Sequence, residues 1–156
     1  MEEILIDTFN INFKNNKFIE GKIKYDECLK VILEIGDQIE LLNKHNIGFL
    51  FLTKKDIIIK DGKYFLNPEL ETYPTNNNVL EINKPFKFNK FMAPELKDIQ
   101  ELPSNVSYNV AFYNLHNIAI ELLGLDELTQ LNPTKLYFLL KRCSSINPDY
   151  RVFLYI

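Results

Sequence analysis

The side chains best suited to chemistry in this sequence are two histidines, two cysteines and scattered carboxylates. His45 and His116 lie far apart, and neither has further ligands nearby at the spacing that zinc sites use. Cys143 and His116 could form a nucleophile and its base, but no local pattern supports that pairing. We therefore predict no metal and no cofactor. We interpret His45 as a helix-end residue and His116 as a hydrogen-bonded residue of the core or a groove.

Composition narrows the class of protein. The 156 residues suit a single domain, and 46% hydrophobic with 25% charged residues is typical of a globular chain. A net charge of −3 without a dense basic block argues against nucleic-acid binding. No apolar run is long enough for a membrane span, and the start, Met1-Glu2-Glu3, lacks a signal pattern. Cys28 and Cys143 are too few for a disulfide framework, so we expect buried thiols in a cytoplasmic protein.

Hydrophobic spacing predicts the elements that must position these groups. Strand-like stretches within residues 4–24 flank a turn that contains two asparagines, which indicates a β-hairpin. Residues 26–45 carry apolar side chains three and four positions apart, which predicts an amphipathic helix. Asp26 is the expected cap of this helix, and Gly36 is expected to weaken it.

The middle of the chain predicts a second hairpin and a long loop. Asp61-Gly62 separates the apolar runs 57–59 and 64–66, and Asp-Gly between such runs is a strong hairpin signal. Residues 67–92 are polar and rich in proline and asparagine, so we expect a long loop of functional or mobile character.

Two helices are predicted in the last third of the chain. Residues 108–123 are apolar on nearly every face, which predicts a buried helix that stops at Gly124. A further helix should extend to about Cys143, with Asn132 as its cap and Pro133 as its first helical residue.

Three motifs in the second half of the chain have a familiar order and spacing. The motifs are Phe91-Met92-Ala93-Pro94-Glu95-Leu96, then Asn117 to Gly124, and then Thr134 to Cys143 followed by Pro148 and Arg151. Together they resemble the large, C-terminal lobe of the protein kinase superfamily, the serine/threonine kinases among them, over roughly residues 18 to 151.

The resemblance implies a fold and one long-range contact. It implies an α+β fold, mainly α, like a kinase C-lobe, with residues 1–24 as a β-hairpin remnant of the small lobe and hinge. Residues 25–156 would form the large lobe, in one compact domain overall. Ala93, Pro94 and Glu95 would close the activation segment, and Glu95 would form an ion pair with Arg151.

The same resemblance places the catalytic positions, and they have degenerated. Phe51 stands at the position of the catalytic Asp, Asp56 at that of the metal-binding Asn, and Asn67 at that of the metal-binding Asp. A phenyl ring cannot accept a proton, and an amide is a poor substitute for a carboxylate on Mg²⁺. We interpret Asp56 as an exposed turn residue and Glu69 as a solvated loop residue. No lysine matches the phosphate-binding lysine of the family. No glycine-rich loop is found either, because the five glycines are widely separated.

One more position concerns the support of the catalytic loop. In the kinase family an Asp on the buried central helix supports this loop, and that position aligns with Ala111. With Phe49, Leu50 and Phe51 in the loop itself, we expect the site to be rebuilt as hydrophobic core.

The functional hypothesis is a pseudokinase that acts as a non-catalytic binding or regulatory module. Its partner would be a protein, either a second copy or another kinase-like protein, and neither nucleic acid nor membrane. One alternative is a residual nucleotide-binding or phosphotransferase protein that uses Asp56, Glu69 or Asp61. The other is a small structural or interaction protein unrelated to kinases, in which the motifs are coincidental.

Overall fold

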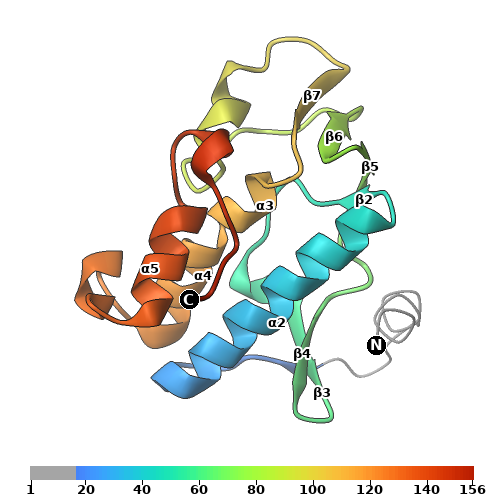
Figure 1. Ribbon diagram of the computed structural model, residues 1–156. Coiled ribbons are helices and arrows are strands. Elements are labelled where there is room, and N and C mark those ends of the chain that lie inside the picture. Colours follow the sequence, from blue (N-terminus) through green and yellow to red (C-terminus); the bar gives the residue numbers. More distant parts are fainter. Residues whose placement is uncertain (1–16) are drawn as a thin grey trace.

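The computed structural model describes residues 17–156. The long helix α2 lies between a group of helices, α3 to α5, and the strands, which gather at the two ends of the molecule (Figure 1). The elements are β1 (Lys17–Phe18), α2 (Tyr25–Lys44), β2 (Ile47–Gly48), β3 (Ile57–Lys60), β4 (Lys63–Leu66), β5 (Tyr73–Asn76), β6 (Val79–Ile82), β7 (Ser104–Ser107), α3 (Val110–Tyr113), α4 (Leu115–Leu123) and α5 (Lys135–Cys143). Short 3₁₀ turns are η1 (Lys54–Asp56), η2 (Pro94–Asp98), η3 (Leu128–Leu131) and η4 (Pro148–Tyr150).

The strands form two antiparallel sheets, in the orders β1-β3-β4 and β2-β5-β6-β7. The α+β class is therefore present, but the prediction of a mainly helical chain is wrong. Helix accounts for 41% and strand for 17% of the described residues. The difference arises because much of the second sheet comes from residues predicted as loop.

Helix α2 confirms the amphipathic pattern but not its cap. The helix starts at Tyr25, and Lys24 occupies the cap position without a side-chain hydrogen bond. Asp26 instead lies in the first turn, where its negative charge is favourable beside the positive end of the helix dipole. The apolar face of the helix is buried in the core.

Gly36 has a packing role in α2. The ring of Phe153 lies where a Cβ at position 36 would be, so a larger residue would collide with it. The same ring stacks on Phe112 at a centroid distance of 5.3 Å. The glycine that lowers helix propensity thus lets the C-terminal segment pack directly against the helix backbone.

The predicted hairpin at Asp61-Gly62 is confirmed. Strands β3 and β4 pair with Ile57 opposite Leu66, and the turn residues Asp61 and Gly62 have φ angles of 52° and 74°. Two consecutive residues of positive φ match the twist of a two-residue hairpin.

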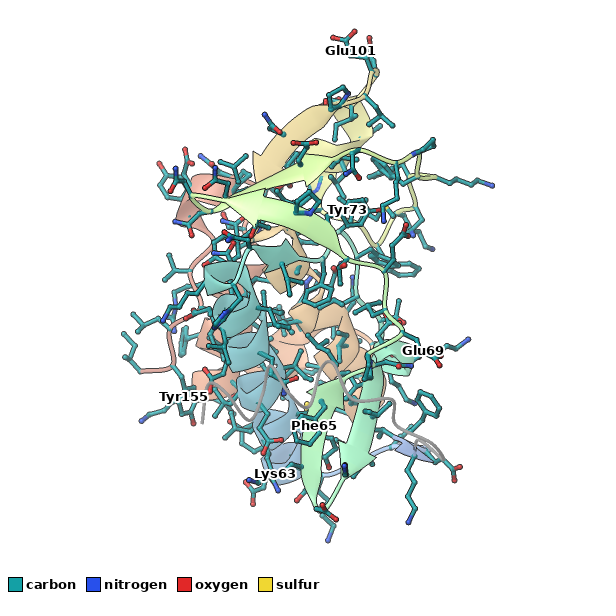
Figure 2. The ribbon with its side chains drawn as sticks, turned by 90° about the vertical axis from the view of Figure 1, so that its right-hand side faces the viewer. Lys63, Phe65, Glu69, Tyr73, Glu101 and Tyr155 are labelled. Carbon is teal, nitrogen blue, oxygen red and sulfur yellow. The ribbon has the colours of Figure 1, made fainter. Side chains whose placement is uncertain are left out.

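Residues 67–92 are not a continuous loop, contrary to the prediction. They contain the hairpin β5–β6, whose turn residues Asn77 and Asn78 have φ angles of 52° and 65°. Asparagine tolerates this left-handed conformation, so Asn77 and Asn78 form the turn of this hairpin, as Asp61 and Gly62 do in the other hairpin. Figure 2 shows the two hairpins at different levels of the molecule, with Lys63 and Phe65 on one and Tyr73 on the other.

The predicted N-terminal hairpin within residues 4–24 lies largely outside the described residues. Its described end, β1, pairs with β3, with Lys17 opposite Ile59. In the described part of that segment, the pairing is therefore with a strand some forty residues later in the chain.

The two C-terminal helices occur with shifted boundaries. The buried helix consists of α3 and α4, separated at Asn114, and Gly124 with a φ of 66° ends it as predicted. Helix α5 begins later than expected: Thr134 is its cap and accepts a hydrogen bond from the Tyr137 N–H at 3.1 Å. Asn132 and Pro133 precede the helix, so their predicted roles are wrong.

The buried apolar side chains fall into two clusters. The larger is formed mainly by α2, α4, α5 and the β3–β4 hairpin, and the smaller by β5, β6, Val110 and residues around Met92. Phe49 and Leu52 belong to the larger cluster, whereas Leu50 belongs to the smaller one. The segment 49–52 therefore joins the two cores.

Among residues 17–156, no helix is both long and apolar enough to cross a membrane.

Candidate functional site

The segment 49–52, which the sequence resemblance predicted to be a degenerate catalytic loop, is mostly packed. Phe49, Leu50 and Leu52 are buried, and Phe51 is half-buried. Phe51 borders two cavities. The expectation that apolar side chains rebuild this segment as core is confirmed for Phe49 and Leu50, whereas Phe51 is only half-buried.

Asp56 is not the exposed turn residue that we expected. It is half-buried, and its carboxylate Oδ2 accepts hydrogen bonds from the Thr53 N–H at 2.8 Å and the Thr53 hydroxyl at 3.2 Å. These bonds cap the short turn η1. The reason for the difference is local: a carboxylate three residues after a threonine closes a capping box and is held in place.

Asn67 and Glu69 form a local turn next to Asp56. The Asn67 N–H donates to the Asp56 carbonyl at 2.8 Å, and the Asn67 side-chain oxygen accepts from the Glu69 N–H at 3.0 Å. Glu69 is exposed, as predicted. The hairpin β3–β4 brings positions 56 and 67 together, but no cluster of three or more metal-type side chains occurs among the described residues.

A cavity of about 360 Å³ lies between the segment 50–56 and the β5–β6 region. Most of its wall is apolar or aromatic, with two carboxylates and the hydroxyls of Thr53 and Tyr73. Figure 2 looks onto this side, with Tyr73 on the sheet and Glu69 on the connection from the lower hairpin. The lining residues are Leu50, Phe51, Thr53, Asp56, Leu70, Glu71, Tyr73, Phe86 and Met92.

A buried asparagine supports the segment, which corrects the expectation based on Ala111. Ala111 is buried in the core, but Asn114 one turn later accepts from the Leu52 N–H at 3.0 Å. The Asn114 amide also donates to the Phe91 carbonyl at 3.1 Å. Asn114 thus joins two loops to the buried helix. The sequence signal for this role was weak, because Asn109 and Asn117 lie in the same largely apolar run as Asn114.

The ion pair expected between Glu95 and Arg151 is present. Arg151 Nη1 lies 2.8 Å from Glu95 Oε2, and Nη2 lies 3.2 Å from Oε1, so the contact is bidentate. The Arg151 side chain is fully buried, and that of Glu95 is 19% exposed. Ala93 is buried beside them, and Pro94 is the first residue of turn η2.

The remaining donors of Arg151 are also used. Nε and Nη2 donate to the Ser145 carbonyl at 3.2 and 2.8 Å, and Nη1 donates to the Asn109 side-chain oxygen at 3.2 Å. Asn109 in turn donates to the Pro148 carbonyl. A buried guanidinium with this many partners holds the residues before α3, the end of α5 and turn η2 together.

The histidines and cysteines have structural surroundings. His45 follows the last residue of α2, and His116 Nδ1 makes a short contact with the Tyr113 carbonyl. Burial lowers the pKa of His116, the hydrogen bond to Tyr113 opposes that shift, and the charge of Arg151 adds to it.

Both cysteines are free, and burial raises the pKa of each thiol to about 12. The Cys143 thiol donates to the Val152 carbonyl at 3.7 Å. A thiol with so high a pKa carries little thiolate at neutral pH, which argues against a nucleophilic role.

No protein-family model matches the chain, and a search of curated proteins found no match either. The roles of these residues are therefore argued from their geometry.

Proposed function

We propose that this chain is a kinase-like fold without phosphoryl transfer, which serves as a binding module through protein contacts. The contact surface is the C-terminal segment 146–156. The partner is a second copy of the chain or another kinase-like protein.

The observation that carries the proposal is the exposure of large apolar side chains along this segment. Ile146, Tyr150 and Ile156 are 76%, 70% and 70% exposed, and Val152 and Leu154 are each 46% exposed. A patch of exposed apolar side chains commonly marks a protein interface.

The segment is also held in place. Its carbonyls at Val152 and Leu154 accept hydrogen bonds from Cys143 and Arg142 of α5, and Phe153 packs between Phe112 and the α2 backbone. The segment follows α5 and passes beside α2 (Figure 1). A pre-arranged surface loses less conformational entropy on binding than a loose one.

The kinase-like interpretation is supported by three contacts. Glu95 and Arg151 pair across 56 residues of sequence, as the resemblance implied. Asn114 holds the segment aligned with the catalytic loop, and the β3–β4 hairpin places Asp56 beside Asn67.

The loss of phosphoryl transfer is supported by the chemistry at the same positions. Phe51 offers no base, and one oxygen of Asp56 already accepts two hydrogen bonds from Thr53. A thermal-shift titration tests this directly: we expect no Mg²⁺-dependent stabilisation by millimolar ATP. A shift that requires Mg²⁺ and disappears in Asp56→Asn would favour the phosphotransferase alternative.

The contact surface is tested with the double variant Ile146→Ser/Leu154→Ser, measured by sedimentation over a range of concentrations and by pull-down from native cells. Phe18→Ser is the matched control, because Phe18 is 45% exposed and lies on β1. We expect the double variant to lose self-association or a captured partner that Phe18→Ser retains. The proposal is contradicted if the wild-type chain is monomeric and if the double variant captures every partner that the wild-type chain captures.

A further inference from the structure

The cavity beside Phe51 combines an apolar wall with negative charge. Six of its lining residues are apolar or aromatic, and its two charged lining residues are Asp56 and Glu71. None of the lining residues is a lysine or an arginine. Its volume of about 360 Å³ suits a small ligand or one to two side chains, at the lower end of the range for ligand pockets. The wall is therefore complementary to a ligand with an apolar body and a positive charge.

Asp56 is a fixed acceptor in this wall. Thr53 holds its Oδ2 with two hydrogen bonds, so the carboxylate does not need to be ordered when a ligand binds. Asp56 as a residue is half-buried, and a charge-assisted hydrogen bond is stronger in such surroundings than at an open surface.

An ammonium group of the chain itself already binds the other acidic part of the wall. Lys84 Nζ lies 2.9 Å from Glu71 Oε1 and 3.2 Å from the Thr72 carbonyl. It also lies 4.7 Å from the centre of the Tyr73 ring, within cation–π distance. Lys84 is not one of the lining residues, so it binds this wall from beside the cavity. In this contact Glu71 and Tyr73 together bind an ammonium group of the chain.

We propose that this cavity binds an organic cation with an aromatic or alkyl body. The positive group is held by Asp56 and Glu71, and the body contacts Phe51, Phe86 and Met92. The ligand is either a free arylalkylamine or an arginine or lysine side chain next to an aromatic residue in a protein segment. The residues that line this cavity lie outside the segment 146–156, so the test of this site does not depend on the contact surface proposed above.

The experiment is an NMR titration of the ¹⁵N-labelled chain with three probes of one shape. They are 4-phenylbutylammonium, the neutral 4-phenylbutanol and the anionic 4-phenylbutanoate. We expect saturable shifts at amides of residues 50–56 and 70–73 with the ammonium, and binding weaker by about tenfold or more with the alcohol. Equal affinity for the ammonium and the alcohol, shifts that map elsewhere, or no saturation with any probe would overturn the proposal.

Charge variants assign the contact. Asp56→Asn/Glu71→Gln should weaken ammonium binding and leave alcohol binding unchanged, because Asn can still accept hydrogen bonds from Thr53. Glu69→Gln is the matched control, since Glu69 is an exposed carboxylate of the same connection and does not line the cavity. If Glu69→Gln weakens binding as much as the double variant, only general electrostatic attraction is at work and the site is refuted.

A further variant should tighten ammonium binding, a result that loss of folding could not produce. Lys84→Met removes the internal competitor for Glu71 and Tyr73, so it should tighten ammonium binding. Lys87→Met is the control, because it removes the same charge from an exposed neighbouring position. Weaker or unchanged ammonium binding in Lys84→Met, relative to Lys87→Met, would contradict the proposed position of the cation.

A peptide arm separates the two sources of the ligand. An acetylated and amidated Gly-Arg-Phe-Gly peptide that binds at the same amides more tightly than 4-phenylbutylammonium assigns the site to a protein segment. Tighter binding of the free amine assigns it to a small molecule.

Discussion

Two ion pairs within residues 17–156 lie in contrasting surroundings. Arg151 and Glu95 meet in the interior, where the Arg151 side chain is fully buried and its donors are all directed at protein acceptors. Lys84 and Glu71 meet at the edge of the cavity, with side chains 44% and 61% exposed. The inner pair joins distant segments and is costly to break, whereas the outer pair is exchangeable with solvent and with other cations.

The largest expected effect comes from breaking the inner pair. Arg151→Ala strands the Glu95 carboxylate and the Ser145 carbonyl, and it should lower the free energy of unfolding by about 3–5 kcal/mol. Chemical denaturation measures this loss, with Lys55→Ala as the control, because Lys55 is exposed. Equal stability of the two variants would show that the buried pair contributes nothing.

Asn114 joins two loops to the buried helix, and its removal should have the next largest effect. Asn114→Ala leaves the Leu52 N–H and the Phe91 carbonyl without their partner, at a cost of about 1–3 kcal/mol. Asn114→Asp should recover part of the loss, because a carboxylate can still accept from Leu52. Asn117→Ala on the same helix is the control for helix propensity, and it should cost less in the same denaturation experiment.

Gly36 tests the packing of the C-terminal segment. Gly36→Ala should be destabilising by about 1 kcal/mol net, since overpacking against Phe153 outweighs the helix propensity of alanine. In a Phe153→Ala background the same change should become stabilising. A Gly36→Ala substitution that stabilises both backgrounds would mean that the ring does not pack on the helix.

The outer pair should have the smallest effect on stability. Glu71→Gln should change the free energy of unfolding by less than about 1 kcal/mol, because both side chains are substantially exposed. At about 1 M salt, where screening acts over about 3 Å, the difference from wild type should vanish. A large loss that persists in high salt would make the two pairs alike and remove the basis of the comparison.

Several features were predictable because they depend on neighbours in sequence. Asp61-Gly62 requires two residues of positive φ in a row, and Gly124 ends a helix in the left-handed conformation. The hairpin at Asn77 and Asn78 uses the same turn geometry. It was missed because the surrounding polar residues resemble a loop and because Pro74 is unusual in a strand.

Local signals were ambiguous where two residues could play one role. Asn132 and Thr134 are both plausible helix caps, and the structure uses Thr134. Asp56 looked like a surface charge until its capping contact with Thr53 was seen. Residue type alone decides neither the helix cap nor the surroundings of Asp56, because both depend on the path of the backbone.

By itself, the sequence determined the amphipathic helix α2 and the β3–β4 hairpin, and its resemblance to the kinase family implied the pairing of Glu95 with Arg151. Only the tertiary structure decided that Asn114 supports the segment at Leu52, that Phe153 covers Gly36, and that Asp56 and Glu71 line one cavity. The physical reason is the distance along the chain over which each kind of interaction acts. Helix and turn preferences act over three or four residues, whereas these contacts join segments that come together only when both cores have packed.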